Sequence, residues 1–383
     1  MKLLHILPSV DPAYGGTTEA VRRISEVFRD DGHVVEIASL DAPDSEYVAK
    51  FPFHVHALGP SKGAYKYAPR FKPWLRQHHR DYDCIVVHGI WQFQSFGAWQ
   101  ALHGTATPYV IYPHGMLDPW FKRTYPMKHI KKWLYWPWGD YRVLRDARAV
   151  LFTCEEERIL ARKSFWLYRA KEIVIGLGTA APDVDLQAAR EEFLSRYPHL
   201  RGKRLALFLA RIHPKKGCDL LIEAFATTLA LDSDWHLVMA GPDSDGWGAK
   251  LQQRCAELKI DHQVTWTGIL KGSMKWGSLA AAECFVLPSH QENFGIAVAE
   301  SLACNLPVLI TDKVNIWKEI ADDTAGLVSN DDLNGIQSLF RQWVAMTDAQ
   351  RAAMRVNSGN CFREHFEISA SARRLLHVLE DIQ

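Results

Sequence analysis

The fold is decided by residues 3–38, which read LLHILPSVDPAYGGTTEAVRRISEVFRDDGHVVEIA. Residues 3–7 form a short apolar run that is typical of a buried strand. Apolar residues then recur at helical spacing, at Val21, Ile24 and Phe28. Gly32 supplies a helix stop, and residues 34–38 form a second apolar run. This stretch therefore predicts a strand, a helix and a second strand parallel to the first.

The same alternation continues along the chain. In the first half, further short apolar runs occupy residues 84–87, 109–112 and 150–152. After the charged, helix-like residues 184–203, a second series occupies residues 205–209, 235–239, 264–267, 284–287, 307–310 and 326–328. Strands that alternate with helices predict parallel sheets. We therefore expect an α/β protein with two doubly wound, Rossmann-like domains facing across a cleft, and ligands at the carboxyl ends of the strands.

Length and composition describe an ordinary globular protein. The 383 residues are 48% hydrophobic, enough for two domains with large cores, and the net charge of +1 argues against nucleic acid as a partner. The seven cysteines are odd in number and widely spaced, which favours a reducing cytoplasm over a disulfide framework or a zinc site. Neither a signal peptide nor a membrane span is predicted.

Two loops after predicted strands carry residues suited to phosphate. The first, DPAYGGTTEA, contains Gly15 and Gly16, which permit close backbone approach ahead of a helix N-terminus; an ordinary turn would look the same. The second, ARIHPKKGCDLLIEAF, places Arg211 and one of Lys215 or Lys216 where two cations could neutralise a diphosphate. Neither loop matches a dinucleotide fingerprint or a Walker motif.

A third loop and helix, SHQENFGIAVAESLA at residues 289–303, holds two glutamates. Gly295 and the helix-forming run after it place Glu292 in the loop and Glu300 in the helix. The helical rise between them is about 12 Å, whereas the two carboxyls of a glycoside hydrolase lie roughly 5–9.5 Å apart. A hydrolytic pair and a divalent-metal site are therefore disfavoured, and the glutamates are expected to contact different parts of one extended ligand.

Taken together, these motifs resemble the retaining glycosyltransferases of family 4, which have the GT-B fold, and the resemblance covers nearly the whole chain. Two motifs carry it most strongly: Glu292 and Glu300 in an E-x7-E pattern with Phe294 and Gly295, and the loop of Arg211, Lys216 and Gly217. Supporting segments are the Gly15-Gly16 loop, His114-Gly115 in YPHGML, FTCEEE at residues 152–157, and Ala240-Gly241-Pro242. One departure is GLGTA at residues 176–180, where the family usually has an asparagine before the glycine.

The resemblance implies a role for each candidate site residue in the second half of the chain. Arg211 and Lys216 would hold the diphosphate of the donor, and Glu300 would contact the nucleotide ribose. Glu292 would contact hydroxyls of the transferred sugar. Backbone amides would lie near it, at Asn293, Phe294 and Gly295.

In the first half, the resemblance implies that Gly15 and Gly16 let the first domain approach the donor and that His114 lies near the reacting centre. His88, in VVHGIW, is a competing His-Gly pair after the preceding strand, with packing as the other interpretation.

The implied activity is transfer of a hexose from a UDP- or GDP-sugar to a saccharide or lipid-linked saccharide acceptor. Cations and a helix N-terminus stabilise the leaving diphosphate, so neither a metal nor another cofactor is expected. By the resemblance, the acceptor hydroxyl would attack from the face of the leaving group, whose phosphate oxygen would take the proton, so that no enzymic nucleophile is required. The alternatives are a sugar-nucleotide epimerase or hydrolase of the same fold and a non-catalytic sugar-binding module.

Two D-x-D pairs point to a different transferase fold, in which such a pair holds a metal. They are Asp232 with Asp234, before a predicted strand, and Asp243 with Asp245, in a Gly/Pro-rich loop. These positions favour ordinary turn and surface aspartates.

Residues 120–148 combine eight Lys or Arg with two Asp and many aromatics. Within this segment, KHIKKWLYWPW predicts a helix with Ile130, Trp133 and Leu134 on one face and lysines opposite. Such a helix can lie on an anionic membrane surface that presents a lipid-linked acceptor; the alternative is that its aromatics pack onto the first sheet. The expected location is the cytoplasm, with a peripheral position at the inner membrane face under the first interpretation.

The last segment, HFEISASARRLLHVLEDIQ, predicts a C-terminal helix. By the resemblance, this helix crosses back to the first domain. The expected domains are residues 1–178 with 365–383 on the acceptor side, and residues 179–364 for the donor nucleotide.

Overall fold

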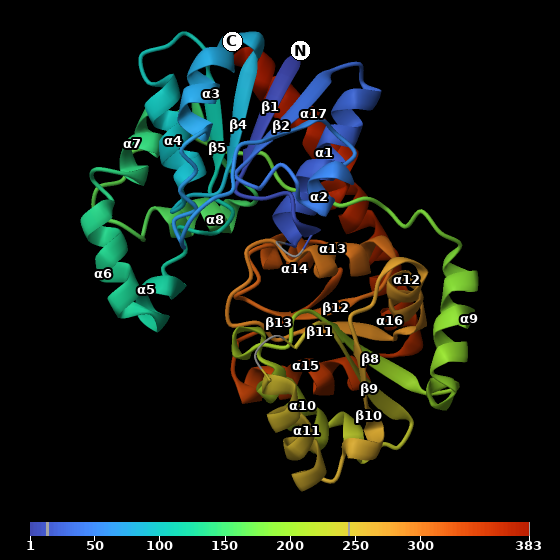
Figure 1. Cartoon of the computed structure of the whole chain (residues 1–383). Helices are drawn as coiled ribbons and strands as arrows, with labels where there is room; N and C mark the ends of the chain where they lie inside the picture. The colour runs from blue at the N-terminus through green and yellow to red at the C-terminus, as the bar shows by residue number, and fades with distance from the viewer. Residues whose placement is uncertain (13–14, 244–245, 383) are drawn as a thin grey trace. The chain divides into compact units, whose positions relative to one another are not determined.

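A computed structural model describes residues 1–12, 15–243 and 246–382. The chain divides into two compact units, which Figure 1 shows in colours that follow the chain. Unit 1 comprises Met1–Gly178 and Ile368–Gln383, and unit 2 comprises Thr179–Glu367. Unit 1 is therefore built from both ends of the sequence. The predicted second passage follows residue 364, whereas in the structure it follows Glu367.

Unit 1 holds a seven-stranded parallel sheet in the order β3-β2-β1-β4-β5-β6-β7. Its strands are β1 (Lys2–Leu7), β2 (Val34–Ser39), β3 (Val55–Ala57), β4 (Cys84–His88), β5 (Tyr109–Tyr112), β6 (Ala149–Phe152) and β7 (Glu172–Val174). Strands β4, β5 and β6 are buried along their whole length, as near-continuous apolar runs require. The chain reverses its direction of travel across the sheet between β1 and β4, and such a switch point is where open α/β sheets bind ligands.

The helices of unit 1 are α1 (Gly16–Asp30), α2 (Glu46–Ala49), α3 (Phe71–His78), α4 (Phe93–Leu102), α5 (Trp120–Thr124), α6 (Pro126–Tyr135), α7 (Asp140–Asp146), α8 (Glu155–Ala161) and α17 (Ile368–Asp381). Helix α1 buries Val21, Ile24 and Phe28, the apolar stripe of the opening stretch. It contacts the C-terminal helix α17, and Figure 1 shows the two side by side.

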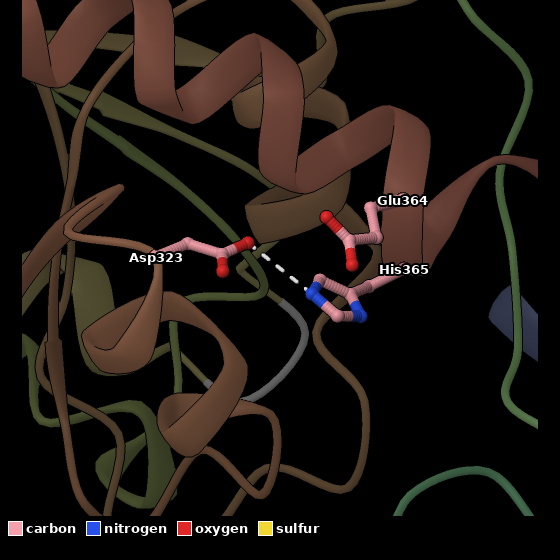
Figure 2. Close-up of side chains that lie close together, drawn as sticks. All are labelled: Asp323, Glu364 and His365. Atoms are coloured by element: carbon pink, nitrogen blue, oxygen red, sulfur yellow. Dashed lines mark ion pairs between the residues drawn. The ribbon is translucent and has the colours of Figure 1, made fainter.

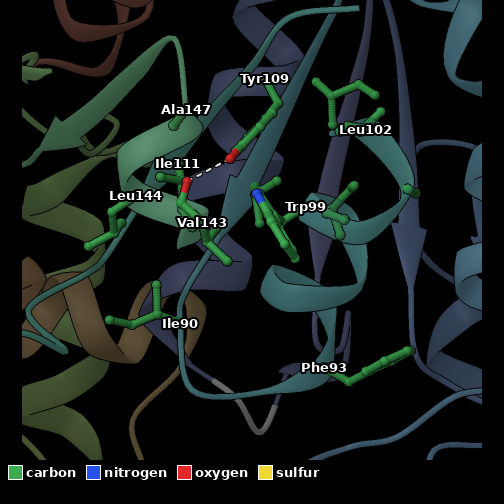
Figure 3. Close-up of a cluster of buried hydrophobic side chains, with 14 of the residues drawn as sticks. Ile90, Phe93, Trp99, Leu102, Tyr109, Ile111, Val143, Leu144 and Ala147 are labelled. Carbon is green, nitrogen blue, oxygen red and sulfur yellow. Dashed lines mark hydrogen bonds between the residues drawn. The ribbon is translucent and has the colours of Figure 1, made fainter. Parts of the chain in front are cut away.

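A buried cluster between the sheet and helices α3, α4 and α7 forms a large part of the core of unit 1 (Figure 3). Burying an aliphatic or aromatic side chain stabilises the fold by about 1.5–3 kcal/mol. The polar ends of the aromatic residues are satisfied within this cluster. The Tyr109 hydroxyl donates to the Val143 carbonyl at 2.6 Å, and Trp99 Nε1 donates to Asp146 Oδ2 at 2.8 Å.

Unit 2 holds a six-stranded parallel sheet in the order β10-β9-β8-β11-β12-β13. Its strands are β8 (Arg204–Leu209), β9 (Trp235–Ala240), β10 (Val264–Gly268), β11 (Cys284–Leu287), β12 (Val308–Thr311) and β13 (Gly326–Ser329). The switch point lies between β8 and β11. The loops after these two strands are the second and third loops singled out in the sequence.

The helices of unit 2 are α9 (Leu186–Arg196), α10 (Cys218–Thr227), α11 (Trp247–Glu257), α12 (Gly272–Ala281), α13 (Ile296–Ala303), α14 (Trp317–Asp322), α15 (Leu333–Ala345) and α16 (Asp348–Cys361). Together with the sheets, they confirm the prediction of two doubly wound, Rossmann-like domains. The fold of this protein therefore differs from the transferase fold in which a D-x-D pair holds a metal.

The departure GLGTA lies where the chain first leaves unit 1. An added Cβ on Gly178 would lie 2.5 Å from Ile368 Cα, and Arg374 Nε donates to the Ile175 carbonyl at 2.8 Å. On the unit 2 side, the Thr179 amide donates to the Phe366 carbonyl at 2.9 Å. The glycine at 178 is therefore needed because the start of α17 packs directly against it.

Candidate active site

The loops after β8 and β11 are joined by a close backbone approach at Gly217. This residue lies in the left-handed region with φ 65°, and a Cβ there would meet the Pro288 carbonyl oxygen at 2.1 Å. Only glycine fits both conditions without strain. The contact fixes the short turn Pro214–Lys216 beside the loop that carries Glu292.

Lys216 and Glu292 form an ion pair between Nζ and Oε2. The Lys216 side chain is buried, with the residue 8% exposed. The sequence leaves Lys215 and Lys216 as alternatives, and the structure pairs Lys216 with the glutamate. Burial alone would raise the pKa of Glu292, but the charge and hydrogen bond of Lys216 outweigh it and lower the pKa. Glu292 is therefore a carboxylate at neutral pH.

The backbone of Glu292 is held on both sides. Its amide donates to the Lys313 carbonyl at 2.9 Å, and its carbonyl accepts from the Asn315 amide at 3.0 Å. Both partners follow strand β12. The glutamate is therefore fixed by a neighbouring strand end as well as by its ion pair.

Glu300 lies in helix α13 and forms a second ion pair, between its Oε1 and Lys275 Nζ at 2.6 Å. Lys275 comes from α12, and its ammonium lies 4.1 Å from the centroid of the Trp276 ring. The structure thus places Glu292 in a loop and Glu300 in a helix, each with its own lysine.

Gly295 caps the N-terminus of α13 with φ 76°, so the free amides of this helix open beside Glu292. The neighbouring Phe294 is buried and packs edge-on against Phe366, with ring centroids 5.7 Å apart. Its side chain supports the loop. The Asn293 side chain accepts from Asn315 Nδ2 at 3.4 Å.

Arg211 follows β8 and is exposed. It has no ion-pair partner among the described residues, so its guanidinium is available to an anion. Its neighbour Ile212 is buried and its amide donates to the Pro242 carbonyl at 2.9 Å, which anchors the loop.

In unit 1, Gly15 caps helix α1 with φ 76° and ψ −135°, and no atom lies within 4 Å of an added Cβ. Gly16 is the first residue of that helix. Ala13 and Tyr14 of the same loop lie outside the described residues. The start of the loop is held by Asp41, which accepts from Ser9 Oγ at 2.6 Å and from the Val10 amide at 2.8 Å.

The sequence offers His88 as an alternative to His114, but in the structure the two histidines lie next to each other. His88 Nδ1 is 3.0 Å from His114 Nε2, and His88 Nε2 is 2.9 Å from His5 Nδ1. Burial lowers the pKa of His114 and of His5 to about 4. The sequence did not single out His5, because a strand residue among leucines was interpreted as core; a polar residue inside a buried parallel strand was the available signal.

The turn that presents His114 is strained and anchored. His114 has φ 51° and Gly115 has φ 73°. The Gly115 amide donates to Glu157 Oε1 at 2.5 Å, and the Thr153 amide donates to Glu157 Oε2 at 2.8 Å. The FTCEEE segment therefore supplies a buried carboxylate that holds the histidine turn.

His88 and His114 line a cavity of about 450 Å³ within unit 1, whose wall also includes Leu7, Ser9, Thr17, Thr18, Trp91, Met116 and Lys132. Burial lowers the pKa of Lys132 to about 8. Its ammonium lies 4.4 Å from the Trp91 ring centroid. The sequence assigns Lys132 to the lysine face of its helix, whereas the structure turns it inward over this aromatic.

Helix α6 also has an exposed apolar face. Ile130 is 52% exposed, Trp133 45% and Leu134 63%. Met127 of the same helix is also exposed, and the exposed Trp166 lies beside Trp133, with ring centroids 6.2 Å apart. These side chains do not pack onto the sheet, whereas Trp136 is fully buried. None of the helices in the described part of the chain has the length and apolar composition that spanning a bilayer requires.

Among the residues that the structure describes, the other acidic groups singled out in the sequence do not join the Lys216–Glu292 pair. Asp232 Oδ1 accepts from the Asp234 amide, and Asp243 accepts from the amides of Trp247 and Gly248, so both are turn or helix-cap residues; Asp245 lies outside the described residues. Figure 2 shows a separate cluster of Asp323, Glu364 and His365, in which His365 Nε2 is 3.2 Å from Asp323 Oδ2. This cluster is a surface ion pair with an exposed glutamate beside it.

Both halves of the chain match family models. Residues 15–178 match one described as "Glycosyl transferase 4-like domain", and residues 189–356 match one described as "Glycosyl transferases group 1". The GDP-mannose:cellobiosyl-diphosphopolyprenol alpha-mannosyltransferase of Xanthomonas campestris is 26% identical over 92% of this chain and 91% of that protein. The D-inositol 3-phosphate glycosyltransferase of Thermomonospora curvata is 31% identical over 50% of this chain and 47% of that protein.

Solved structures share the fold over the whole length. The sucrose-phosphate synthase of Thermosynechococcus elongatus has a TM-score of 0.79 at 18% identity, covering 100% of this chain and 98% of that chain. Anabaena HepE in complex with UDP and glucose has a TM-score of 0.76 at 16% identity, covering 99% of both chains.

Proposed function

We propose a reaction from the premise that this chain belongs to the glycosyltransferases of the GT-B fold and is a hexosyltransferase. In this proposal, the enzyme moves a hexose from a UDP- or GDP-sugar with retention of configuration and without a metal. The single observation that carries the proposal is the ion pair of buried Lys216 with partly buried Glu292, with the exposed Arg211 on the same loop after β8 as Lys216. The two cations can bind the diphosphate of a sugar nucleotide, and the carboxylate can bind hydroxyls of its sugar.

The charges of this site suit the leaving group. In glycosyl transfer, the departing diphosphate gains negative charge in the transition state, and fixed cations stabilise that charge. In our proposal Lys216 and Arg211 hold the diphosphate, and the amides at the start of α13 add a positive helix end. Because these groups supply positive charge, the reaction we propose proceeds without a metal or another cofactor.

In our proposal, the two carboxylates bind the other two parts of the donor, its sugar and its ribose. Glu292, ionised beside Lys216, accepts hydrogen bonds from hydroxyls of the transferred sugar, and Glu300 accepts from the ribose. The amides of Asn293, Phe294 and Gly295 lie next to Glu292. In unit 1, Gly15 has open space around its backbone, and Gly16 begins helix α1; in our proposal this backbone approaches the donor.

For the acceptor, we propose a saccharide or lipid-linked saccharide of a polysaccharide or glycolipid pathway. The relative from Xanthomonas campestris, by its name, acts on cellobiosyl-diphosphopolyprenol with GDP-mannose. HepE, by contrast, was solved with UDP and glucose. Both donor bases therefore remain in the proposal.

A thermal-shift screen of nucleoside diphosphates tests the donor site. We expect UDP or GDP to raise the melting temperature, because a ligand that binds only the folded state stabilises it by about 2.7 kcal/mol at a hundredfold excess over its Kd. Lys250→Ala, an exposed lysine on α11, should respond as the wild type does. No stabilisation by any nucleoside diphosphate would contradict the proposal. Conversion of the matching sugar nucleotide without acceptor would favour the epimerase or hydrolase alternative.

The apolar surface of α6 supports a place at a membrane. Its exposed Trp133 and Leu134 lie on a helix with exposed lysines at 128 and 131, the composition of a helix that lies in an anionic interface. We propose that the enzyme is peripheral at the cytoplasmic face, where a lipid-linked acceptor is presented.

Cosedimentation with liposomes tests this surface. We expect binding to vesicles that contain phosphatidylglycerol and little binding to neutral vesicles, and Trp133→Ser with Leu134→Ser should lower the bound fraction several-fold because both apolar area and anchoring are lost. The matched control is Leu231→Ser, an 81% exposed leucine of unit 2. Equal binding with and without the anionic lipid would refute the membrane role.

A further inference from the structure

Three histidines from separate strands of unit 1 form a continuous row. His5 lies in β1, His88 ends β4, and His114 follows β5. Their hydrogen bonds run from His5 Nδ1 to His88 Nε2 at 2.9 Å and from His88 Nδ1 to His114 Nε2 at 3.0 Å. Adjacent rings are nearly parallel, at interplanar angles of 20° and 17°, with centroids 5.2 Å and 5.3 Å apart, so they meet edge to edge through their nitrogens. The strand order β1-β4-β5 brings residues from three parts of the sequence into this row.

All three rings are neutral at physiological pH. His5 and His88 are buried, 0% and 1% exposed, and burial lowers the pKa of each member of the row. Burial lowers the pKa of His88 well below its usual value, and the rings on either side add to the cost of charging it. No carboxylate is hydrogen-bonded to a ring of the row among the described residues.

Neutral rings in such a row cannot choose their tautomers independently. A neutral imidazole has one N–H donor and one lone pair, and each hydrogen bond in the row needs one of each. Either all three rings carry the proton on Nδ1, or all three carry it on Nε2. The tautomer of His114 is therefore coupled to that of His5 through His88.

The two ends of the row decide between these states. His5 Nε2 is buried and has no hydrogen-bond partner in the part of the chain that the structure describes. A buried N–H without a partner is rarer, and less well tolerated, than an acceptor without one. At the other end, His114 lines the 450 Å³ cavity, and its Nδ1 makes no hydrogen bond to a described residue. The state with Nδ1 protonated leaves only a lone pair at His5 and directs a donor to the cavity.

We propose that His5 and His88 are positioning residues that hold His114 neutral and protonated on Nδ1, so that it donates a hydrogen bond to a hydroxyl oxygen of the bound sugar. The part that concerns the sugar rests on the proposed function. The tautomer itself is a property of the protein without substrate. A donor of fixed direction orients an oxygen of the substrate without adding a positive charge.

The first experiment reads the tautomers directly, by nitrogen NMR of the protein labelled with 15N-histidine, with His114 assigned by comparison with His114→Asn. We expect Nδ1 of His114 to resonate as a protonated nitrogen and Nε2 as an unprotonated one. A proton on Nε2 would overturn the proposal. Because no nucleotide is present, this result is independent of whether the proposed transferase reaction is correct.

The second experiment breaks the row at its far end. His5→Phe removes the N–H that His88 Nε2 accepts, so His88 loses its preference and the His114 spectrum should change to a mixture of both tautomers. His5→Asn retains an N–H near the position of Nδ1 and should restore the wild-type spectrum. His79→Phe is the matched control, because His79 is also buried in unit 1 but bonds to Thr107. An unchanged His114 spectrum in folded His5→Phe would overturn the role of His5.

Kinetics with the nucleotide sugar found above extend the test to turnover. His5→Phe is expected to lower kcat about tenfold, the effect of one misdirected hydrogen bond, with KM for the donor unchanged. His5→Asn should recover most of kcat, whereas a purely structural role would give two variants that lose stability and activity together. A wild-type kcat in His5→Phe, in a protein whose tautomers have changed, would overturn the role in orienting the substrate.

Discussion

Lys216→Ala is expected to lower kcat by a factor on the order of 10²–10³, the usual effect of removing one group that stabilises transition-state charge. The same substitution should lower the stability of the protein without nucleotide by about 3–5 kcal/mol, because Glu292 is then a mostly buried carboxylate without its cation. Initial rates with saturating donor and denaturant unfolding measure the two effects. A wild-type kcat in this variant would refute the diphosphate assignment.

The loss of stability should depend on pH with a defined sign. In the wild type the pKa of Glu292 is lowered, so its contribution is present above its unfolded pKa of about 4.3 and is lost as pH falls through the folded value. Without Lys216, burial dominates and raises this pKa. The stability deficit of Lys216→Ala should therefore narrow as pH is lowered from 7 towards 5, because protonation removes the unpaired charge.

Two further variants separate charge from packing. The double variant Lys216→Met with Glu292→Gln removes both charges, so it should recover most of the lost stability while turnover stays low. Lys250→Ala changes a lysine that is exposed on α11 and should change neither property. Recovery of turnover in the double variant would contradict a role for the charges in catalysis.

Gly217→Ala is expected to have the second large effect. A Cβ at this position would meet the Pro288 carbonyl oxygen at 2.1 Å, so the loops after β8 and β11 must move apart and Lys216 loses its place beside Glu292. We expect a loss of roughly 3–5 kcal/mol in stability together with a fall in kcat of at least tenfold. Thermal unfolding and initial rates measure both.

Gly202→Ala is the matched control for the strain of a left-handed residue. Gly202 has φ 77°, but no atom lies within 4 Å of its added Cβ. This variant should therefore lose only about 1–2 kcal/mol and keep its kcat. If Gly217→Ala behaved no worse than Gly202→Ala, the close approach of the two loops would not be what positions Lys216.

The interior strands of both sheets could be predicted from the sequence because buried parallel strands are continuous apolar runs. Strands β3 and β7 could not, because each is a three-residue edge strand with only partial burial and lacks such a run. The positions of the candidate site residues in the fold were predictable in a similar way. Motifs after strands located Glu292 and Glu300, but spacing could not decide between Lys215 and Lys216, since a tight turn determines which side chain points inward.

Long-range contacts account for what remained hidden. His5 acquires its partner only because the strand order places β1 beside β4, and no local pattern contains that information. Helical periodicity places Lys132 on a face with other lysines. In the structure, however, its ammonium lies over the ring of Trp91, which is far from it in sequence. Helical periodicity predicted the apolar face of α6. It could not predict that this face is exposed, because exposure depends on which distant segments pack against the helix.

The passage of the chain out of unit 1 and back has a consequence for how the protein forms during synthesis. Unit 2 is continuous and can fold as soon as its last residue, Glu367, leaves the ribosome. Unit 1 cannot be completed then, because Ala372, Leu375 and Leu379 fill its core only after helix α17 has been made. Until then α1 lacks the helix that packs against it, so the nascent protein should depend on chaperones most strongly between the synthesis of unit 2 and that of α17.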